Sequence, residues 1–248
     1  MITKSQVKYI QSLGQKKFRD EQEVFIAEGP KIINELLAML HKDLVELYAT
    51  AEWMDTHASS LKDIRIPKIT PVKDTELERI SFLSAPNQVL AVFKKPATAA
   101  LSSLPGKISL MLDGIQDPGN MGTIIRIADW FGINQITCST DCADAFSPKV
   151  VQSSMGSIAR VKLLYTDLLK TVQENTSLCL YAASLYGKKI TAVEKLKTGV
   201  IVIGNESKGI SKELLELCRE QITIPRIGHA ESLNAAVATG ILLSHLVS

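Results

Sequence analysis

The chain has 248 residues, 46% of them hydrophobic and 22% charged, and a formal net charge of +2 at pH 7. These values are typical of an ordinary globular protein of one or two domains, and they exclude a histone-like polycation, though not a local basic face. No apolar run reaches the roughly 18 residues of a membrane-spanning helix, and the first residues lack the apolar core of a signal peptide. We therefore expect a cytoplasmic protein with no membrane partner.

The first 93 residues alternate helix and strand patterns. Apolar residues between 32 and 40 recur at helical spacing, and Pro30 stands where the first turn of a helix tolerates proline. Short apolar runs predict strands at residues 24–29, 45–50, 64–66 and 89–93. This alternation predicts a small α/β domain over residues 1–93. The next stretch, 94–106, is rich in small residues with a proline near each end, and we interpret it as a linker.

Residues 107–248 repeat the alternation with more strongly apolar strands. The predicted strands lie at residues 108–112, 135–138, 178–183, 200–203 and 221–224. Unbroken apolar strands between helices indicate a parallel sheet that is covered on both faces. The final segment, from Leu233 to Val247, is apolar nearly all round. We therefore expect a buried helix there, covered in part by a second subunit.

Three polar motifs each follow one of these strands. They are N-x-G-x-x-x-R from Asn120 to Arg126, G-N-E-S-K-G at 204–209, and I-P-R-I-G at 224–228 followed by S-L-N at 232–234. Loops at the ends of parallel strands converge on one edge of the sheet, where open α/β folds bind their ligands. The dinucleotide fingerprint G-x-G-x-x-G and the phosphate-loop pattern G-x-x-x-x-G-K-[ST] do not occur at these positions, so a nicotinamide or nucleoside-triphosphate enzyme is not favoured.

The polar residues of these motifs also have local structural interpretations. Asn120 and Ser232 are suited to cap the N-termini of the helices predicted after them. Arg126 falls among isoleucines in the second turn of its predicted helix, and a cation in such surroundings needs an anionic partner. Glu206, at the end of another buried strand, is the candidate for that partner.

The four cysteines and four histidines are scattered along the chain. No two cysteines form a C-x-x-C pair, and Cys138 and Cys142 merely flank a turn-like Ser-Thr-Asp. We therefore expect reduced thiols and no metal site.

Taken together and in this order, the three motifs resemble those of the SpoU (TrmH) family of RNA 2′-O-ribose methyltransferases, within the SPOUT superfamily. The resemblance covers about residues 107 to 246. The stretch from Lys16 to Lys31 is similar, with less specificity, to the RNA substrate-binding domain that precedes the catalytic domain in many members. That domain is a small α/β fold of the ribosomal-protein L30e-like type.

The resemblance implies a parallel-sheet catalytic domain with a deep trefoil knot, S-adenosylmethionine as the cofactor, and a homodimer as the active unit. By motif position, the cofactor would be contacted by Ala183, Ser184, Gly204, Ile224 and Leu233. The catalytic set would comprise Asn120, Arg126, Glu206, Ser232 and Asn234. In the implied reaction a ribose 2′-hydroxyl attacks the sulfonium methyl. Because a guanidinium rarely gives up its proton, our hypothesis is that Arg126 stabilises the developing alkoxide or orients the adjacent RNA phosphate, held by Glu206.

Basic residues interleaved with aromatic ones in the N-terminal segment favour the binding of single-stranded or loop RNA. The candidate RNA-binding residues are Lys16, Lys17, Phe18 and Arg19. Ribosomal RNA is the expected substrate, because a separate N-terminal domain is commoner in family members that act on it, and transfer RNA is the alternative. Three other functions stay open: an RNA-binding protein without catalysis, a methyltransferase acting on a base nitrogen, and a non-enzymatic ribosome-associated module.

Overall fold

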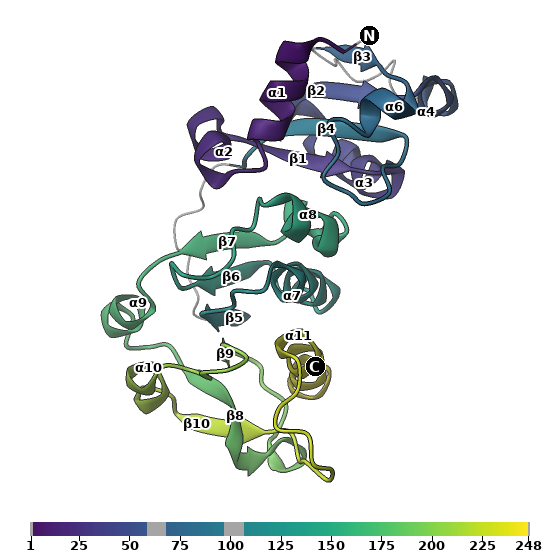
Figure 1. Cartoon of the computed structure of the whole chain (residues 1–248). Coiled ribbons are helices and arrows are strands. Elements are labelled where there is room, and N and C mark those ends of the chain that lie inside the picture. The colour runs from purple at the N-terminus through teal and green to yellow at the C-terminus, as the bar shows by residue number, and fades with distance from the viewer. Residues whose placement is uncertain (1, 59–67, 97–106, 248) are drawn as a thin grey trace. The chain divides into compact units, whose positions relative to one another are not determined.

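The computed structural model describes residues 2–58, 68–96 and 107–247 (Figure 1). The chain forms two compact units. The N-terminal unit comprises Met1–Ala97 and Asp144–Ala159, and the C-terminal unit comprises Thr98–Ala143 and Arg160–Ser248. Within the described ranges, no helix is both long enough and apolar enough to cross a bilayer.

The N-terminal unit is built on a four-stranded sheet in the order β1-β4-β2-β3. Its strands are β1 (Val24–Glu28), β2 (Leu44–Ala49), β3 (Ile69–Pro71) and β4 (Val89–Lys94). β4 lies antiparallel between β1 and β2, and β3 joins β2 in parallel. Three predicted strands are confirmed by β1, β2 and β4, whereas β3 is one that the sequence pattern does not predict. The strand expected at 64–66 lies outside the described residues.

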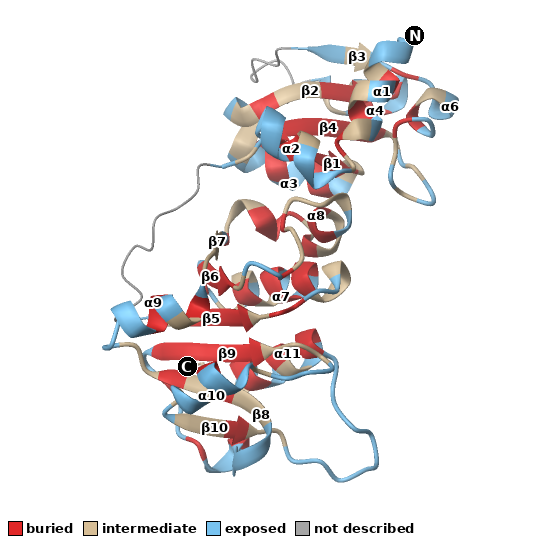
Figure 2. Cartoon of the chain, turned by 60° about the vertical axis from the view of Figure 1, so that its left-hand side comes forward, coloured by how far each residue is buried: buried red, intermediate tan, exposed pale blue. Residues whose placement is uncertain are grey.

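Short helices pack around this sheet. They are α1 (Lys4–Ser12), α2 (Lys16–Gln22), α3 (Pro30–Leu40), η1 (His41–Asp43), α4 (Ala51–Thr56), α6 (Asp74–Leu77), α8 (Pro148–Ser154) and η2 (Ser157–Ala159). α3 begins at Pro30 as predicted, directly after Gly29, whose φ of 85° a residue without Cβ adopts readily. Burial concentrates in β1 and β4, which are the reddest part of this sheet in Figure 2.

The N-terminal unit also contains a segment from the middle of the chain, residues 144–159. The ring of Phe146 lies 5.2 Å from that of Phe25 on β1. Asp144 accepts a 2.5 Å hydrogen bond from Arg19, whose side chain is only 2% exposed and also donates to the carbonyl oxygen of Leu13. The predicted division of the chain at 94–106 does not anticipate this excursion, because no composition change marks it.

The C-terminal unit contains a six-stranded sheet in the order β10-β8-β9-β5-β6-β7. Its strands are β5 (Ile108–Asp113), β6 (Gln135–Cys138), β7 (Lys162–Tyr165), β8 (Leu180–Lys189), β9 (Gly199–Gly204) and β10 (Glu220–Thr223). All neighbouring pairs are parallel. The predicted parallel sheet is therefore confirmed, although β7 is an addition and β8 runs six residues beyond the predicted end at 183.

Helices cover both faces of this sheet. α7 (Pro118–Trp130) and α11 (Ala235–Leu246) lie on one face, and α9 (Leu168–Glu174) and α10 (Lys212–Glu216) lie on the other, with η3 (Ile190–Ala192) after β8 (Figure 1). α11 begins two residues later than predicted. Within one chain its cover is incomplete, because Val237 is 51% exposed and Ile241 37%, and the predicted cover by a second subunit stays a prediction.

The strand order explains where the three motifs meet. Because β10, β8, β9 and β5 are adjacent and parallel, their carboxyl ends lie along one edge of the sheet. The first turns of α7, which follows β5, and the loops after β9 and β10 carry the three polar motifs. The motifs are thus brought together by topology, as the sequence predicts.

Candidate active site

The loop after β9, residues 205–211, is fixed by its own polar groups and is called the β9 loop. The Asn205 side chain donates to the carbonyl oxygen of Gly114 at 2.7 Å and accepts from the amides of Ser207 and Lys208 at 2.9 and 3.0 Å. The Asp113 carboxylate accepts from both the amide and the hydroxyl of Ser211 at 2.7 Å. These bonds hold the loops after β5 and β9 together without any ligand.

Gly204 makes this arrangement possible at the end of β9. A Cβ at this position would lie 2.3 Å from the carbonyl carbon of Gly209 and 2.3 Å from the amide nitrogen of Ile210. Both clashes are with backbone, which cannot rotate away. The β9 loop therefore closes over Gly204 only because the residue has no side chain.

Asn120 connects the first motif to the second and the third. Its amide nitrogen donates to the Glu206 carboxylate at 2.6 Å, and its amide oxygen accepts from the Asn234 side chain at 2.7 Å. The expectation that Asn120 caps its helix is wrong: Asp117 is the N-cap of α7 and accepts from the Asn120 backbone amide at 2.8 Å. The Asn120 side chain is thereby left to bridge Glu206 and Asn234.

Asn234 also caps the last helix. Its side-chain oxygen accepts from the backbone amides of Ala236 and Val237 at 3.0 and 3.2 Å. The expectation that Ser232 is this cap is wrong, and Ser232 is instead an exposed residue that lines the neighbouring pocket. Asn234 thus uses its oxygen for the helix and its nitrogen for Asn120.

Arg126 does not join this network within one chain. It lies six positions after Asn120, about 9 Å along the helix axis and on a different side of the helix. Arg126 is exposed and makes no ion pair or side-chain hydrogen bond with any residue that the structure describes. The predicted Arg126–Glu206 pair is therefore wrong in the single chain, as is the expectation that Arg126 lies among core residues.

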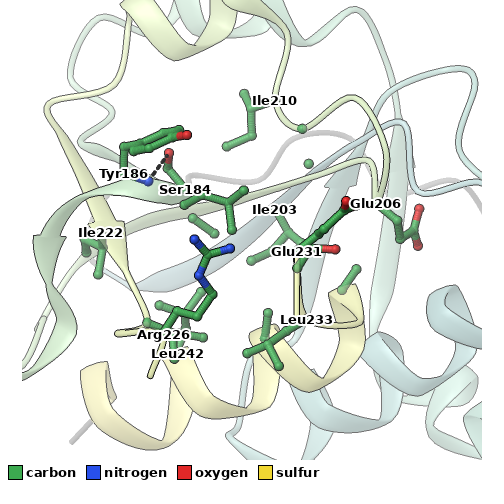
Figure 3. A pocket seen from close by; sticks show the side chains of 18 of the residues that line it. Ser184, Tyr186, Ile203, Glu206, Ile210, Ile222, Arg226, Glu231, Leu233 and Leu242 are labelled. Carbon is green, nitrogen blue, oxygen red and sulfur yellow. Dashed lines mark hydrogen bonds between the residues drawn. The ribbon is translucent and has the colours of Figure 1, made fainter. Parts of the chain in front are cut away.

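A pocket of about 600 Å³ opens beside the network, between residues 183–186 of β8, the loops after β9 and β10, and α11 (Figure 3). Every residue predicted to contact the cofactor lines it: Ala183, Ser184, Gly204, Ile224 and Leu233. Glu206 and Ser232 line it as well. Its floor is apolar, with Ile203, Ile222 and Leu242, and volume and lining are both of the kind that bind a nucleoside-sized molecule.

Two pocket residues were missed by sequence reasoning. Arg226 lies inside the third motif but at a position the motif leaves open, and its guanidinium points into the pocket in Figure 3. Tyr186 is 80% exposed at the rim, and its backbone amide donates to the Ser184 hydroxyl at 3.2 Å. A cation directly after Pro225, in the loop that follows β10, is the signal that could have identified Arg226.

The four candidate RNA-binding residues on α2 differ in exposure and in their partners. Lys16 and Lys17 are exposed and form loose ion pairs one turn along, with Asp20 at 3.3 Å and with Glu21 at 3.8 Å. Phe18 is half-buried against the core of the N-terminal unit. The prediction that Arg19 binds RNA is wrong. Its guanidinium is buried and bonded to Asp144 and to a backbone carbonyl, so it is not available to RNA.

No group of three or more potential metal ligands exists among the residues that the structure describes. Cys138 and Cys142 are buried, free thiols behind the loop after β6. A hydrogen bond from Cys138, with others from Ser139 and from backbone amides, lowers the pKa of Cys142 to about 7, while burial raises the pKa of Cys138. These contacts are accounted for by the packing of Cys138 and Cys142 against the loop after β6.

Comparison with known proteins identifies two family profiles along the chain. The sequence profile of the SpoU rRNA methylase family matches residues 107–244, more than half of the chain. The chain belongs to this family. A second profile, the MRM3-like substrate binding domain, matches residues 4–91.

Several relatives resemble the chain over nearly its whole length. A TrmH-family protein from Porphyromonas gingivalis has 34% identity and a TM-score of 0.85, covering 100% of this chain and 98% of that one. The AdoMet-bound rRNA methyltransferase from Sinorhizobium meliloti has 29% identity and a TM-score of 0.83, covering 100% and 97%. RlmP of Bacillus subtilis, a 23S rRNA 2′-O-methyltransferase of guanosine, is 28% identical over 97% of this chain and 95% of its own length.

The cofactor of this SpoU protein is S-adenosylmethionine, as its family and its AdoMet-bound relative show. The pocket fits that molecule on its own chemistry. Apolar walls and backbone groups suit an adenosyl group, and side chains of both signs, Glu206, Glu231, Lys208 and Arg226, suit a ligand that carries charges of both signs.

Proposed function

We propose that this SpoU protein methylates a ribose 2′-hydroxyl in ribosomal RNA, with S-adenosylmethionine as the methyl donor. The observation that carries the proposal is the hydrogen-bonded chain of Glu206, Asn120 and Asn234, which joins the three motifs beside the pocket. RlmP, which matches nearly the whole chain, acts on 23S ribosomal RNA. Transfer RNA is the second candidate, because a cyanobacterial relative of similar coverage is described as a tRNA/rRNA methyltransferase.

The site residues have distinct roles in this proposal. A ribose hydroxyl is a weak nucleophile, so the site must align it and stabilise the loss of its proton. When bound, S-adenosylmethionine supplies a methyl group on a sulfonium. Asn120 and Asn234 hold the polar side of the site in place, Glu206 fixes the Asn120 amide, and Ser232 orients the nucleotide at the pocket rim. Arg126 stabilises the developing alkoxide or the neighbouring phosphate.

The cofactor is held mainly by the pocket's backbone and apolar groups. The five lining residues that the motifs indicate, Ala183, Ser184, Gly204, Ile224 and Leu233, contact its adenosyl part. Replacing Gly204 by alanine tests this, because the added Cβ displaces the β9 loop from its backbone contacts. Loss of S-adenosylmethionine binding in isothermal titration is the expected result, and unchanged binding would contradict the assignment.

A homodimer completes the proposal. Trp130 on α7 is 84% exposed, and Val237 and Ile241 on α11 add further exposed apolar surface on the helix that packs against α7. Arg126 shares the exposed stripe of α7 with Thr123 and Trp130, at i, i+3 and i+7 spacing. We place the dimer contact on these two helices, so that Arg126 of one protomer serves the pocket of the other. Sedimentation should show a dimer at micromolar concentration, and a monomer would count against it.

The proposal includes three further properties that the family implies. The segment after β10 is threaded to form a deep trefoil knot, which accords with the β9 and β10 loops lining one pocket, and an electron-density trace through residues 204–235 tests it. The protein is expected in the cytoplasm, and cell fractionation would test this by locating it in the soluble fraction. Residues 1–93 form the L30e-like domain that binds RNA through Lys16 and Lys17, and catalysis lies in 107–248. Most of the predicted linker at 94–106 lies outside the described residues. Lys16→Glu with Lys17→Glu should weaken RNA binding.

The first experiment measures methyl transfer from labelled S-adenosylmethionine to unmodified ribosomal RNA and, separately, transfer RNA. Products are digested to nucleosides and identified by mass. Wild type and the control Lys212→Met, an exposed residue of α10 outside the pocket, should yield a 2′-O-methylnucleoside from ribosomal RNA, and Arg126→Ala should not. Transfer to transfer RNA alone would replace the substrate assignment. A methylated base, or no transfer to either RNA, would overturn the proposed reaction.

A further inference from the structure

The pocket contains a guanidinium whose role the motifs do not assign. Arg226 lines the pocket three residues after the end of β10, and Figure 3 shows its side chain directed inward, near the apolar residues Ile222 and Leu242. Its only side-chain bond within the described residues is from Nη1 to the carbonyl oxygen of Ala230, at 3.2 Å. Arg226 is exposed, and its remaining N–H donors have no partner among the residues that the structure describes.

The two carboxylates of the pocket do not neutralise this cation. Glu206 is hydrogen-bonded to Asn120, and neither Glu206 nor Glu231 lies within ion-pair distance of Arg226 in the part of the chain that the structure describes. The remaining cation of the pocket lining is Lys208, on the β9 loop. An unpaired guanidinium over an apolar floor is a binding site for an anion, and its planar fork matches a carboxylate in a bidentate pair.

The cofactor carries one such group. S-adenosylmethionine has a sulfonium, an α-ammonium and a single α-carboxylate, so a pocket that holds it must accommodate a negative charge close to two positive ones. We propose that Arg226 binds the α-carboxylate of the methionyl part and so orients the cofactor, with the exposed Glu231 on the same loop facing the α-ammonium. The inference rests on the S-adenosylmethionine site and adds to it a positioning residue for the methionyl end.

The alternative anion is a phosphate of the RNA. The pocket location favours the cofactor, because Arg226 lies with Ser184, Ile203 and Leu242 among residues that line the cavity itself. Arg226 is exposed, so a phosphate can also reach it, but the exposed Lys16 and Lys17 already offer cations to the RNA backbone. A cofactor analogue that lacks the α-carboxylate distinguishes the carboxylate from an RNA phosphate.

The test pairs a deletion on the protein with a deletion on the cofactor. Isothermal titration measures the binding of S-adenosylmethionine and of decarboxylated S-adenosylmethionine, which lacks only the α-carboxylate, to wild type, Arg226→Met and Arg226→Lys. Lys212→Met, on the surface of α10, is the charge-matched control. Thermal melting without ligand shows whether each variant is folded.

Wild type and the control should prefer the carboxylated cofactor by about ten- to hundredfold, the range of one charge-assisted hydrogen bond or pair. In Arg226→Met this preference should fall close to one, because both ligands then lack the pair, and Arg226→Lys should retain part of it. Three results would overturn the inference: no preference in wild type, a preference that survives in Arg226→Met, or unchanged cofactor binding in Arg226→Met with a raised KM for RNA. Failure of wild type to bind either ligand would instead contradict the cofactor site itself.

Discussion

Two loops that line the same pocket are held in opposite ways. The β9 loop, 205–211, is fixed by Asn205 and by the bonds from Ser211 to Asp113. The β10 loop, residues 224–234, has almost no internal support: residues 225–233 make no backbone–backbone hydrogen bond with any residue that the structure describes. Ile227 near its tip is fully exposed.

This difference in support suggests separate roles for the two sides of the site. The polar side, with Glu206 held by Asn120, is preorganised before any ligand binds, which is what stabilisation of developing charge requires. The cofactor side rests on a loop that loses conformational entropy when it becomes ordered, which reduces the net binding free energy. We therefore expect changes in the polar side chains of the β9 loop to alter kcat or stability, and changes in the β10 loop to alter cofactor affinity; Gly204→Ala differs because it displaces the backbone of the β9 loop.

The largest effect should follow from Glu206→Gln. The amide keeps the shape and can still accept from Asn120, but it removes the negative charge of the preorganised side. We expect kcat for methyl transfer to fall on the order of 10²–10³, as when one electrostatic contact to a reacting group is lost, with cofactor affinity close to wild type. Glu213→Gln, exposed on α10, is the control and should match wild type. A drop confined to cofactor affinity would show that Glu206 belongs to the binding side.

The next effect is on stability. Asn205→Ala removes three side-chain hydrogen bonds of the β9 loop and should lower its opening free energy by about 2–3 kcal/mol. Hydrogen exchange of peptides covering residues 199–211 measures this locally, which a global melt of a two-unit chain does not. Ser207→Ala, whose exposed hydroxyl makes no hydrogen bond within the described residues, should change exchange little. Equal exchange in both variants would mean that the β9 loop is not held by Asn205.

Most of the C-terminal sheet could be predicted because its strands are continuous apolar runs buried from both sides. β7 could not, since Lys162 at its start is exposed and its other residues are only half-buried, so the run is short and weak. The loops were located by the same reasoning, because the end of a buried strand fixes where a loop begins. Their convergence then followed from parallel order.

The internal geometry of the site was less predictable, because several residues near a helix start can act as its cap. Asp117 and Asn120 both have capping side chains, and Pro118 at the first helical position is the signal that favours Asp117. Ser232 and Asn234 are likewise both suited to cap α11; Asn234 is the cap, and it also donates to Asn120. Arg126 was expected to meet Glu206 because both follow strands, but helical rotation turns it to another side. Burial of Arg19 depends on Asp144, 125 residues away, which no local pattern reveals.

Limited digestion with trypsin would compare the two loops directly, because each has one exposed cleavage site, after Lys208 and after Arg226. Without ligand, cleavage after Arg226 should be the faster of the two, because its loop lacks backbone hydrogen bonds. At about ten times its Kd, S-adenosylmethionine should slow that cleavage about tenfold if cleavage requires the ligand-free loop. Mass spectrometry of the early fragments gives both rates. Faster cleavage after Lys208, or no protection after Arg226 at saturating ligand, would contradict the proposal that the β10 loop is less firmly held than the β9 loop.

The smallest effect concerns Asn234, where the β10 loop is tied to the polar side. Asn234→Ala removes both the cap of α11 and the donor to Asn120, and should cost about 1 kcal/mol of stability, the usual value for a lost N-cap. Asn234→Asp keeps a capping oxygen, with a charge that suits a helix N-terminus, but it cannot donate to Asn120 and adds a second carboxylate near Glu206. Its thermal stability should stay above that of Asn234→Ala, while methyl transfer falls in both. If Asn234→Asp were as active as wild type, the link from Asn234 to Asn120 would have no part in holding the site, and the two loops would be independent.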